Sequence, residues 1–198
     1  MLWTTGSVFS MVANPDRRAT VCDTALRILG RDGARSLTHR AVDREAELPL
    51  GTTSNYFSTR SALFAGMATR LFEALEPAPS RLEKLKKLPA ATAGPAYISY
   101  IVERLLVQPD LARAWFELRL EAKRSPEIAA LVMPVLREGF AQDVAFHEER
   151  GLPGGADTVR ALHYLVDGLV FDALTVQIDP QADPIDNATR ISCTFFPQ

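Results

Sequence analysis

The stretch from Leu37 to Leu63 constrains the fold most strongly, because its helical pattern is interrupted by a tight turn. Thr38 has the side-chain oxygen typical of a helix N-cap, and a small apolar face follows it. Pro49 suits the first position of a second helix, which we expect to run to Tyr56. Helices this short are unstable alone, so both must pack against other helices. The second helix also has a face of small and polar residues that this packing does not require.

This stretch resembles the DNA-binding helix-turn-helix of the tetracycline-repressor (TetR) family of regulators, within a motif resemblance over about residues 15 to 70. The resemblance implies a ligand-responsive transcriptional regulator, a repressor as in that family. It implies a dimer that binds a pseudo-palindromic operator in double-stranded DNA and is released by a small-molecule effector. The positions that match the family pattern are Thr38, Val42, Ala46, Leu48, Gly51, Thr52, Tyr56, Phe57, Arg60, Ala62 and Leu63.

Four positions depart from the family pattern. Asp43 replaces an alanine, Glu47 the glycine of the turn, Thr53 a larger apolar residue and Ser54 a tyrosine. A positive φ at Glu47 would cost free energy. Ser54 removes an aromatic ring that often contacts bases, so the operator sequence does not carry over. The two new carboxylates lie near the expected phosphates and motivate an alternative: a helical dimer that acts through protein partners, with a degenerate DNA-reading head.

The distribution of charge favours DNA binding by the N-terminal part. Residues 14 to 63 hold eight arginines and six carboxylates, whereas the whole chain has a formal net charge of −2. The guanidinium group suits phosphate because its planar fork can bind two oxygens. A solvated charged surface is the other interpretation of this cluster, so the charge supports the motif without replacing it.

We assign DNA contacts by residue type. Thr38, Thr52, Tyr56 and Arg60 are predicted to bind phosphates, which fixes register without reading sequence. His39 and Arg40 either reach a phosphate or are solvated. Asn55 is the best candidate for direct readout, because its amide can pair with adenine. The residues predicted to face the bases are Leu50, Gly51, Ser54 and Asn55, with Gly51 permitting close backbone approach.

The remaining sequence predicts an all-α fold, since no β-alternation persists. Besides the helix-turn-helix, we expect helices over about 15–32, 61–75, 95–108, 110–124, 126–150 and 157–178, with Pro134 kinking or splitting the fifth. Proline-containing stretches after residue 75 and over 89–95 are expected to be loops. The predicted organisation is a mobile N-terminal extension (1–13), a three-helix helix-turn-helix DNA-binding domain (14–60), a larger helical ligand-binding and dimerisation domain (61–178) and a tail (179–198). The tail could fold back or hang free.

The helices predicted over 126–150 and 157–178 are apolar on more than one face. One apolar stripe suffices for the core of a monomer. We therefore predict that these two helices pair with their copies in a homodimer, where Gly168 would permit close approach. Burial on all sides by the same chain is the alternative. A dyad would place two reading helices about one turn of DNA apart, roughly 34–36 Å.

If the family resemblance holds, the larger domain contains a ligand cavity. Residues such as Trp115 and Phe116 are more often core than ligand contacts, and Arg119 and His147 could pair with an acidic ligand or lie at a surface or interface. Nothing in the sequence identifies the effector. The residues on helices expected to surround the cavity are Tyr97, Tyr100, Ile101, Trp115, Phe116, Arg119, Phe140, His147 and His163.

Other functional classes find little support. The sequence has no phosphate-binding glycine loop and no cluster at metal-ligand spacing, so we predict no enzyme activity, cofactor or metal. His147, Glu148 and Glu149 are interpreted as the solvated end of a helix. No apolar run approaches the roughly 18 residues of a membrane span, and nothing about Cys22 and Cys193 suggests an oxidising compartment. We therefore expect a cytoplasmic protein.

Overall fold

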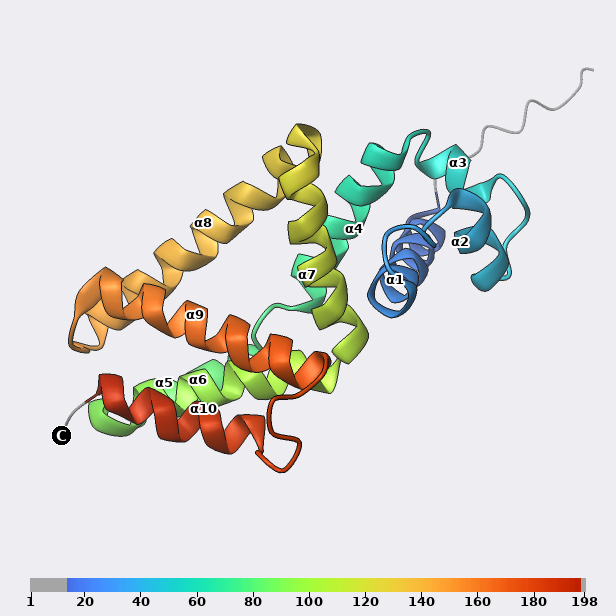
Figure 1. Cartoon of the computed structure of the whole chain (residues 1–198). Helices are drawn as coiled ribbons and strands as arrows, with labels where there is room; N and C mark the ends of the chain where they lie inside the picture. Colours follow the sequence, from blue (N-terminus) through green and yellow to red (C-terminus); the bar gives the residue numbers. More distant parts are fainter. Residues whose placement is uncertain (1–13, 197–198) are drawn as a thin grey trace, which may run out of the picture.

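The chain is all-α in the computed structural model, which describes residues 14–196 (Figure 1). No strand occurs in this range, and none of its helices is long and apolar enough to cross a membrane. The helices, in chain order, are α1 (Pro15–Asp32), α2 (His39–Glu45), α3 (Thr52–Tyr56), α4 (Arg60–Ala74), α5 (Pro79–Lys86), α6 (Ala90–Val107), α7 (Pro109–Arg124), α8 (Pro126–Glu149), α9 (Gly155–Leu174) and α10 (Pro184–Ser192), followed by a 3₁₀ turn, η1 (Cys193–Phe195). The predicted extension over residues 1–13 lies outside the described residues.

The first two helices have the predicted bounds because their caps are local. Asn14 accepts hydrogen bonds from the amides of Asp16 and Arg17, and Thr38 accepts one from Ala41. The predicted start of the third helix at Pro49 was wrong. Gly51 takes a left-handed φ of 91° and α3 begins after it, while the Pro49 carbonyl accepts from the Thr52 amide. Pro49 therefore belongs to the turn.

The loops predicted around prolines 79 and 95 were also wrong. Pro79 is the first residue of α5, and Pro95 lies within α6, which already begins at Ala90. Proline ends one helix and suits the first turn of the next, so its position alone does not distinguish the two. Pro134 does not split α8, which continues to Glu149. It lies on an exposed face, where water can bond the carbonyl that the missing amide leaves free.

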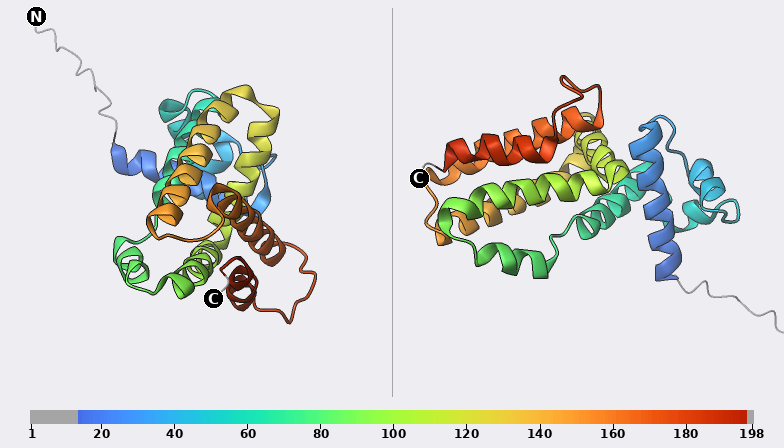
Figure 2. Two further views of the ribbon diagram at one scale, coloured as in Figure 1. Left: turned by 90° about the vertical axis from the view of Figure 1, so that its left-hand side faces the viewer. Right: turned by 90° about the horizontal axis from the view of Figure 1, so that it is seen from below.

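The C-terminal segment folds back onto the body. Helix α10 packs along α6 and also touches α9, as both views of Figure 2 show. Phe196 is buried, and its ring lies against Gly94, where a Cβ would be 2.5 Å from the ring. The segment predicted as a separate tail, as far as residue 196, is thus part of the helical body.

Two buried clusters share helix α7. The first contains side chains of α1, α2, α4 and α8 together with Ala114 and Leu118 of α7. The second contains side chains of α6, α9 and α10 together with Ala112 of α7. The most extensive packing between any two helices is that of α1 on α7. At this crossing a Cβ on Gly30 would lie only 2.0 Å from the Asp110 carbonyl oxygen, so the two backbones are in direct contact.

We predict that Gly30→Ala destabilises the protein by about 1–3 kcal/mol, because the added methyl group must force α1 away from α7. The measurement is the free energy of unfolding in urea. Gly139→Ala on α8 is the matched control, since its Cβ meets no heavy atom within 4 Å and alanine favours helix. Equal stability of Gly30→Ala and the unmodified protein would contradict the close contact.

Candidate nucleic-acid interface and ligand cavity

A buried carboxylate joins α2 to the start of α3. Asp43 Oδ2 accepts from the Gly51 amide at 2.7 Å, and Oδ1 accepts from the Thr53 amide at 2.7 Å and the Thr53 hydroxyl at 2.6 Å. Asp43 is 1% exposed and Thr53 is fully buried. Since Gly51 has no side chain to cap α3, Asp43 supplies the acceptor for its first amides. The carboxylate therefore sets the position and direction of α3.

The burial of Asp43 corrects one sequence interpretation. Asp43 was expected near the phosphates, where its charge would disfavour DNA, but it faces inward. The departures from the family pattern at positions 43 and 53 belong together, because each supplies the hydrogen-bond partner that the other requires. Glu47 remains exposed and has a φ of 54°, so it occupies the left-handed backbone region without the freedom of glycine.

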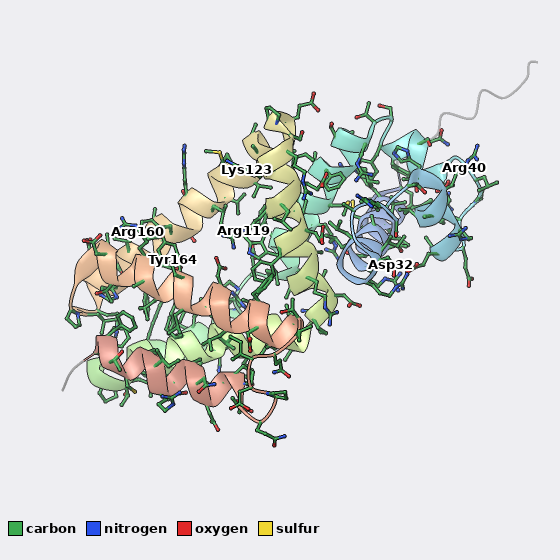
Figure 3. All side chains as sticks on the ribbon, viewed as in Figure 1. Asp32, Arg40, Arg119, Lys123, Arg160 and Tyr164 are labelled. Carbon is green, nitrogen blue, oxygen red and sulfur yellow. The ribbon has the colours of Figure 1, made fainter. Side chains whose placement is uncertain are left out.

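The outer face of α3 is exposed and does not pack against the rest of the protein. Leu50, in the turn before it, is 80% exposed, and Ser54 and Asn55 are exposed. Arg40 on neighbouring α2 is exposed at the outer edge of the molecule (Figure 3). Thr38 is exposed at the cap of α2, Gly51 and His39 are half-buried, and His39 Nε2 is buried without a partner among the described residues. Leu50, Ser54 and Asn55 are thus exposed at the start and outer face of α3, and Arg40 is exposed on the helix that packs against it.

Three residues predicted to bind phosphate have partners within the protein. Arg60 donates to the carbonyls of Leu37 and Ala34, both at 2.8 Å, and its guanidinium lies over the ring of Phe64. The Thr52 hydroxyl donates to the Pro49 carbonyl at 2.6 Å. The Tyr56 hydroxyl accepts from the Asn14 amide at 3.2 Å, but its proton is free to donate. Arg60 and Thr52 therefore stabilise the fold of this region.

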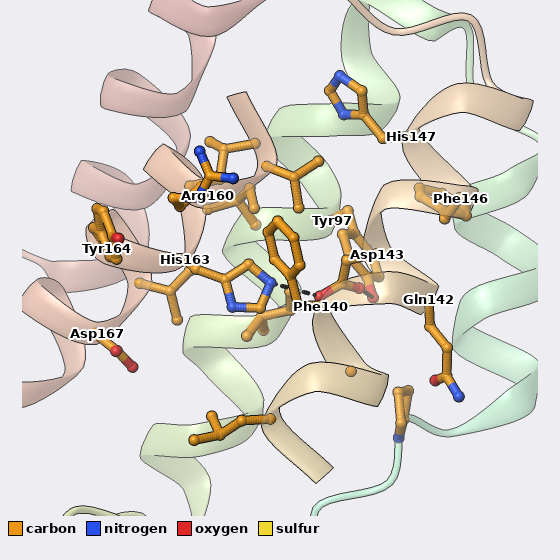
Figure 4. Close-up of a pocket in the computed structure, with 18 of the residues that line it drawn as sticks. Tyr97, Phe140, Gln142, Asp143, Phe146, His147, Arg160, His163, Tyr164 and Asp167 are labelled. Atoms are coloured by element: carbon orange, nitrogen blue, oxygen red, sulfur yellow. Dashed lines mark hydrogen bonds and ion pairs between the residues drawn. The ribbon is translucent and has the colours of Figure 1, made fainter. Parts of the chain in front are cut away.

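A cavity of about 530 Å³ lies between α4, α6, α7, α8 and α9 (Figure 4). Seven of the nine residues expected to surround the cavity line it: Tyr97, Ile101, Trp115, Arg119, Phe140, His147 and His163. Phe116 instead faces the second cluster and stacks edge-on against Phe171. Tyr100 lines a separate hollow beside α5 and α10.

The cavity contains a carboxylate that the sequence analysis missed. Asp143 accepts from the Tyr97 hydroxyl at 3.0 Å and pairs with His163 Nε2 at 2.9 Å (Figure 4). Burial, reinforced by the Asp143 charge, raises the pKa of Tyr97 well above its usual value, so the phenol keeps its proton. The i, i+3 spacing of Phe140 and Asp143 on α8 would have placed them on one face, but no sequence signal connected Asp143 with Tyr97 or His163.

His147 is buried, contrary to the expected solvated helix end. It is 3% exposed, and its Nε2 lies 2.7 Å from the Pro153 carbonyl. The Leu152 amide donates to the His147 carbonyl, which closes the turn between α8 and α9. His147 therefore anchors this turn while its ring lines the end of the cavity, near Phe196.

Comparisons with known proteins agree with this architecture. Residues 89–192 match the family model described as the tetracyclin repressor-like C-terminal domain. The chain is 24% identical over 191 residues to the HTH-type nicotine-responsive transcriptional repressor HdnoR of Paenarthrobacter nicotinovorans, covering 89% of this chain and 93% of the relative. The multidrug binding protein EbrR complexed with imidazole is 26% identical, with a TM-score of 0.68 and coverage of 93% and 97%. A TetR-family member from Streptomyces coelicolor A3 is 25% identical, with a TM-score of 0.68 and coverage of 93% and 100%.

We predict that Asp43→Ala destabilises the protein by on the order of 3 kcal/mol, because two amides and a hydroxyl lose their acceptor. Adding Thr53→Val should restore about 1 kcal/mol by removing the orphaned hydroxyl. Thermal and urea unfolding measure both effects. Asp23→Ala is the control, since its half-exposed ion pair with Arg70 contributes at most about 1 kcal/mol. Equal losses in the single and double variants would contradict the pairing.

Proposed function

The chain belongs to the TetR family of ligand-binding transcriptional repressors, and from this premise we propose that it binds a pseudo-palindromic operator as a homodimer and leaves it when a small molecule fills its cavity. Proteins of this family regulate transcription and are not enzymes. The observation that carries the proposal is the outer face of α3, which Asp43 holds in place while Leu50, Ser54 and Asn55 stay exposed.

Operator reading is assigned to the short helix α3. Asn55 would pair with a base edge in the major groove, with Leu50 and Ser54 beside it. Arg40, Thr38 and the free proton of Tyr56 would contact phosphates and fix the register. The inward direction of Asp43 supports this assignment over a degenerate reading head, because the carboxylate does not face the phosphates.

Dimerisation is assigned to the outer faces of α8 and α9. Met133 on α8 is 43% exposed, and Tyr164 and Phe171 on α9 are 68% and 55% exposed. Gly168 lies between the last two, and a Cβ there would meet no heavy atom of the same protomer within 4 Å. An exposed apolar face with a gap for close approach suits a second copy of the same pair of helices.

Effector release is assigned to the cavity through α4. Phe72 of α4 and Leu75, its C-cap, line the cavity, and Phe72 stacks edge-on against Trp115 at 5.6 Å. Helix α4 begins at Arg60, which holds the loop between α1 and α2. A ligand that favours one position of α4 would therefore change the position of the reading helix. It acts only through its difference in affinity between the two states. HdnoR is named nicotine-responsive and EbrR is a multidrug binding protein, which supports a small organic effector here.

The test of the proposal is selection of genomic fragments by the purified protein at two salt concentrations. Enrichment of one inverted repeat, with affinity that falls as salt rises, is the expected result. Retention of unrelated sequences, or of none, would overturn operator binding.

On the selected operator, Asn55→Ala should cost about 1–3 kcal/mol of binding free energy and relax the preference at one base position in each half-site. Arg40→Ala should instead weaken all sequences alike and reduce the salt slope by about 1, as expected for a phosphate contact. Both are measured by fluorescence anisotropy with the operator and with each single-base variant. Equal weakening of every sequence by Asn55→Ala would make it a backbone contact.

Phe171→Glu should convert the dimer to a monomer at micromolar concentration, because a carboxylate would be buried against its copy without a partner. Sedimentation equilibrium measures the mass of the particle. Val107→Glu is the matched control, since Val107 is 72% exposed and lies on α6 outside the two helices. A monomeric unmodified protein, or an unchanged dimer in Phe171→Glu, would remove this interface.

A further inference from the structure

The body of the cavity is aromatic. Aromatic residues of five helices line it, and its volume of about 530 Å³ lies in the range of sites for small organic molecules. The ring of Phe140 stands edge-on to the His163 ring at 5.6 Å, so the Asp143 carboxylate lies among ring faces and edges (Figure 4). The aromatic residues that line the cavity are Phe72, Tyr97, Trp115, Phe140, Phe146, Tyr164 and Phe196.

The cavity offers an acidic group to a ligand. The lining has two carboxylates, of which Asp167 is paired with Arg119 at 2.7 Å. Asp143 has no arginine or lysine partner in the described part of the chain, and it is 25% exposed. Its two described partners, Tyr97 and His163, leave lone pairs on both oxygens. A carboxylate surrounded by aromatic rings suits a protonated nitrogen attached to a flat apolar body.

A second charged group of the cavity is an arginine that lacks an acceptor in the described part of the chain. Arg104 lines the cavity, and its Nε and Nη1 atoms are buried without an acceptor among residues 14–196. The guanidinium lies 5.6 Å from the centre of the Tyr100 ring. A buried cationic donor with no acceptor is costly, so an acceptor brought by a ligand would be bound strongly.

The other arginines that line the cavity form ion pairs with aspartates. Arg119 pairs with Asp167, and Arg160 pairs with Asp157 at the start of α9 and lies over the ring of Phe140. The cavity therefore presents one carboxylate and one guanidinium that lack a charged partner of opposite sign, apart from the imidazole of His163 beside the carboxylate. A ligand with only one charge would leave the other group unsatisfied.

We propose that the cavity takes an aromatic compound with a basic nitrogen at one end and an acceptor oxygen, carbonyl or carboxylate, at the other. The nitrogen binds Asp143, in competition with His163, and the oxygen accepts from Nε and Nη1 of Arg104. The rings of Tyr97, Trp115 and Phe140 cover the body between the two ends. This inference rests on the proposed function only in that the same cavity is the effector site.

Four simple probes test the proposal on the unmodified protein. Benzylamine carries only the nitrogen, benzoate only the acceptor, and para-(aminomethyl)benzoate and its longer biphenyl analogue carry both. Isothermal titration calorimetry gives the dissociation constants. We expect at least one of the two-ended probes to bind tenfold or more tightly than the better of the one-ended probes. Two-ended probes that bind no better than the one-ended ones, or no binding by any probe, would overturn the proposal.

Two substitutions test which side chain binds each end of the probe. In Arg104→Met, the carboxylate of the two-ended probe should no longer increase its affinity. In Asp143→Asn, the amine should no longer increase it. Each substitution should lower the affinity for the two-ended probe about tenfold. Arg81→Met is the matched control, because Arg81 also lies 5.6 Å from the Tyr100 ring but lines the separate hollow. An equal loss in Arg81→Met, or no loss in Arg104→Met, would contradict the assignment.

Operator binding measured without ligand distinguishes a failure of the ligand class from a failure of the proposed function. If the variants and the unmodified protein bind the selected operator but show no preference among the probes, the ligand class is overturned and the proposed function stands. Loss of operator binding by the unmodified protein, with two-ended probes still preferred, would overturn the proposed function and leave the ligand class standing.

Discussion

Asp43 accepts three hydrogen bonds from the start of α3, and the position of the exposed face of that helix depends on them. A five-residue helix has little stability of its own. Its direction is therefore set from outside, by the carboxylate on α2 and by the packing of Phe57 beneath it. Because Asp43 and Thr53 are buried, their hydrogen bonds are not weakened by competing water. The exposed face of α3 can thus vary in sequence while its support stays fixed.

Local signals predicted much of the fold. Thr38 marked the start of α2 correctly because a cap acts within one turn of the backbone. The start of α3 was missed because its acceptor, Asp43, lies on the preceding helix. Prolines after residue 75 were ambiguous, since the same residue stops one helix and begins the next. The packing of α10 on α6 depends on contacts about 90 residues apart, such as Ser99 with Thr189, and no local pattern encodes them.

At the two candidate sites, too, features visible in the local sequence were predicted and contacts between distant residues were not. Several aromatic and basic residues of the cavity, such as Tyr97 and Arg119, were predicted because they stand out on the helices of the larger domain, whereas Arg104 was missed. Asp143 was missed because an acid on an amphipathic helix looks like a surface residue, and its partners Tyr97 and His163 lie 46 and 20 residues away. Phe116 packs against the second cluster while its neighbour Trp115 lines the cavity, since adjacent residues of a helix point in different directions.

The direct backbone contact between Gly30 and Asp110 also bears on how α7 and α1 can move relative to each other. Side chains can change rotamer and so absorb a small displacement between two helices, whereas peptide groups in contact have no such freedom. A sliding or tilting of α7 must therefore displace α1 by a comparable amount instead of being lost at the crossing. This makes the α1–α7 contact a stiff joint, through which a displacement of one helix is passed directly to the other.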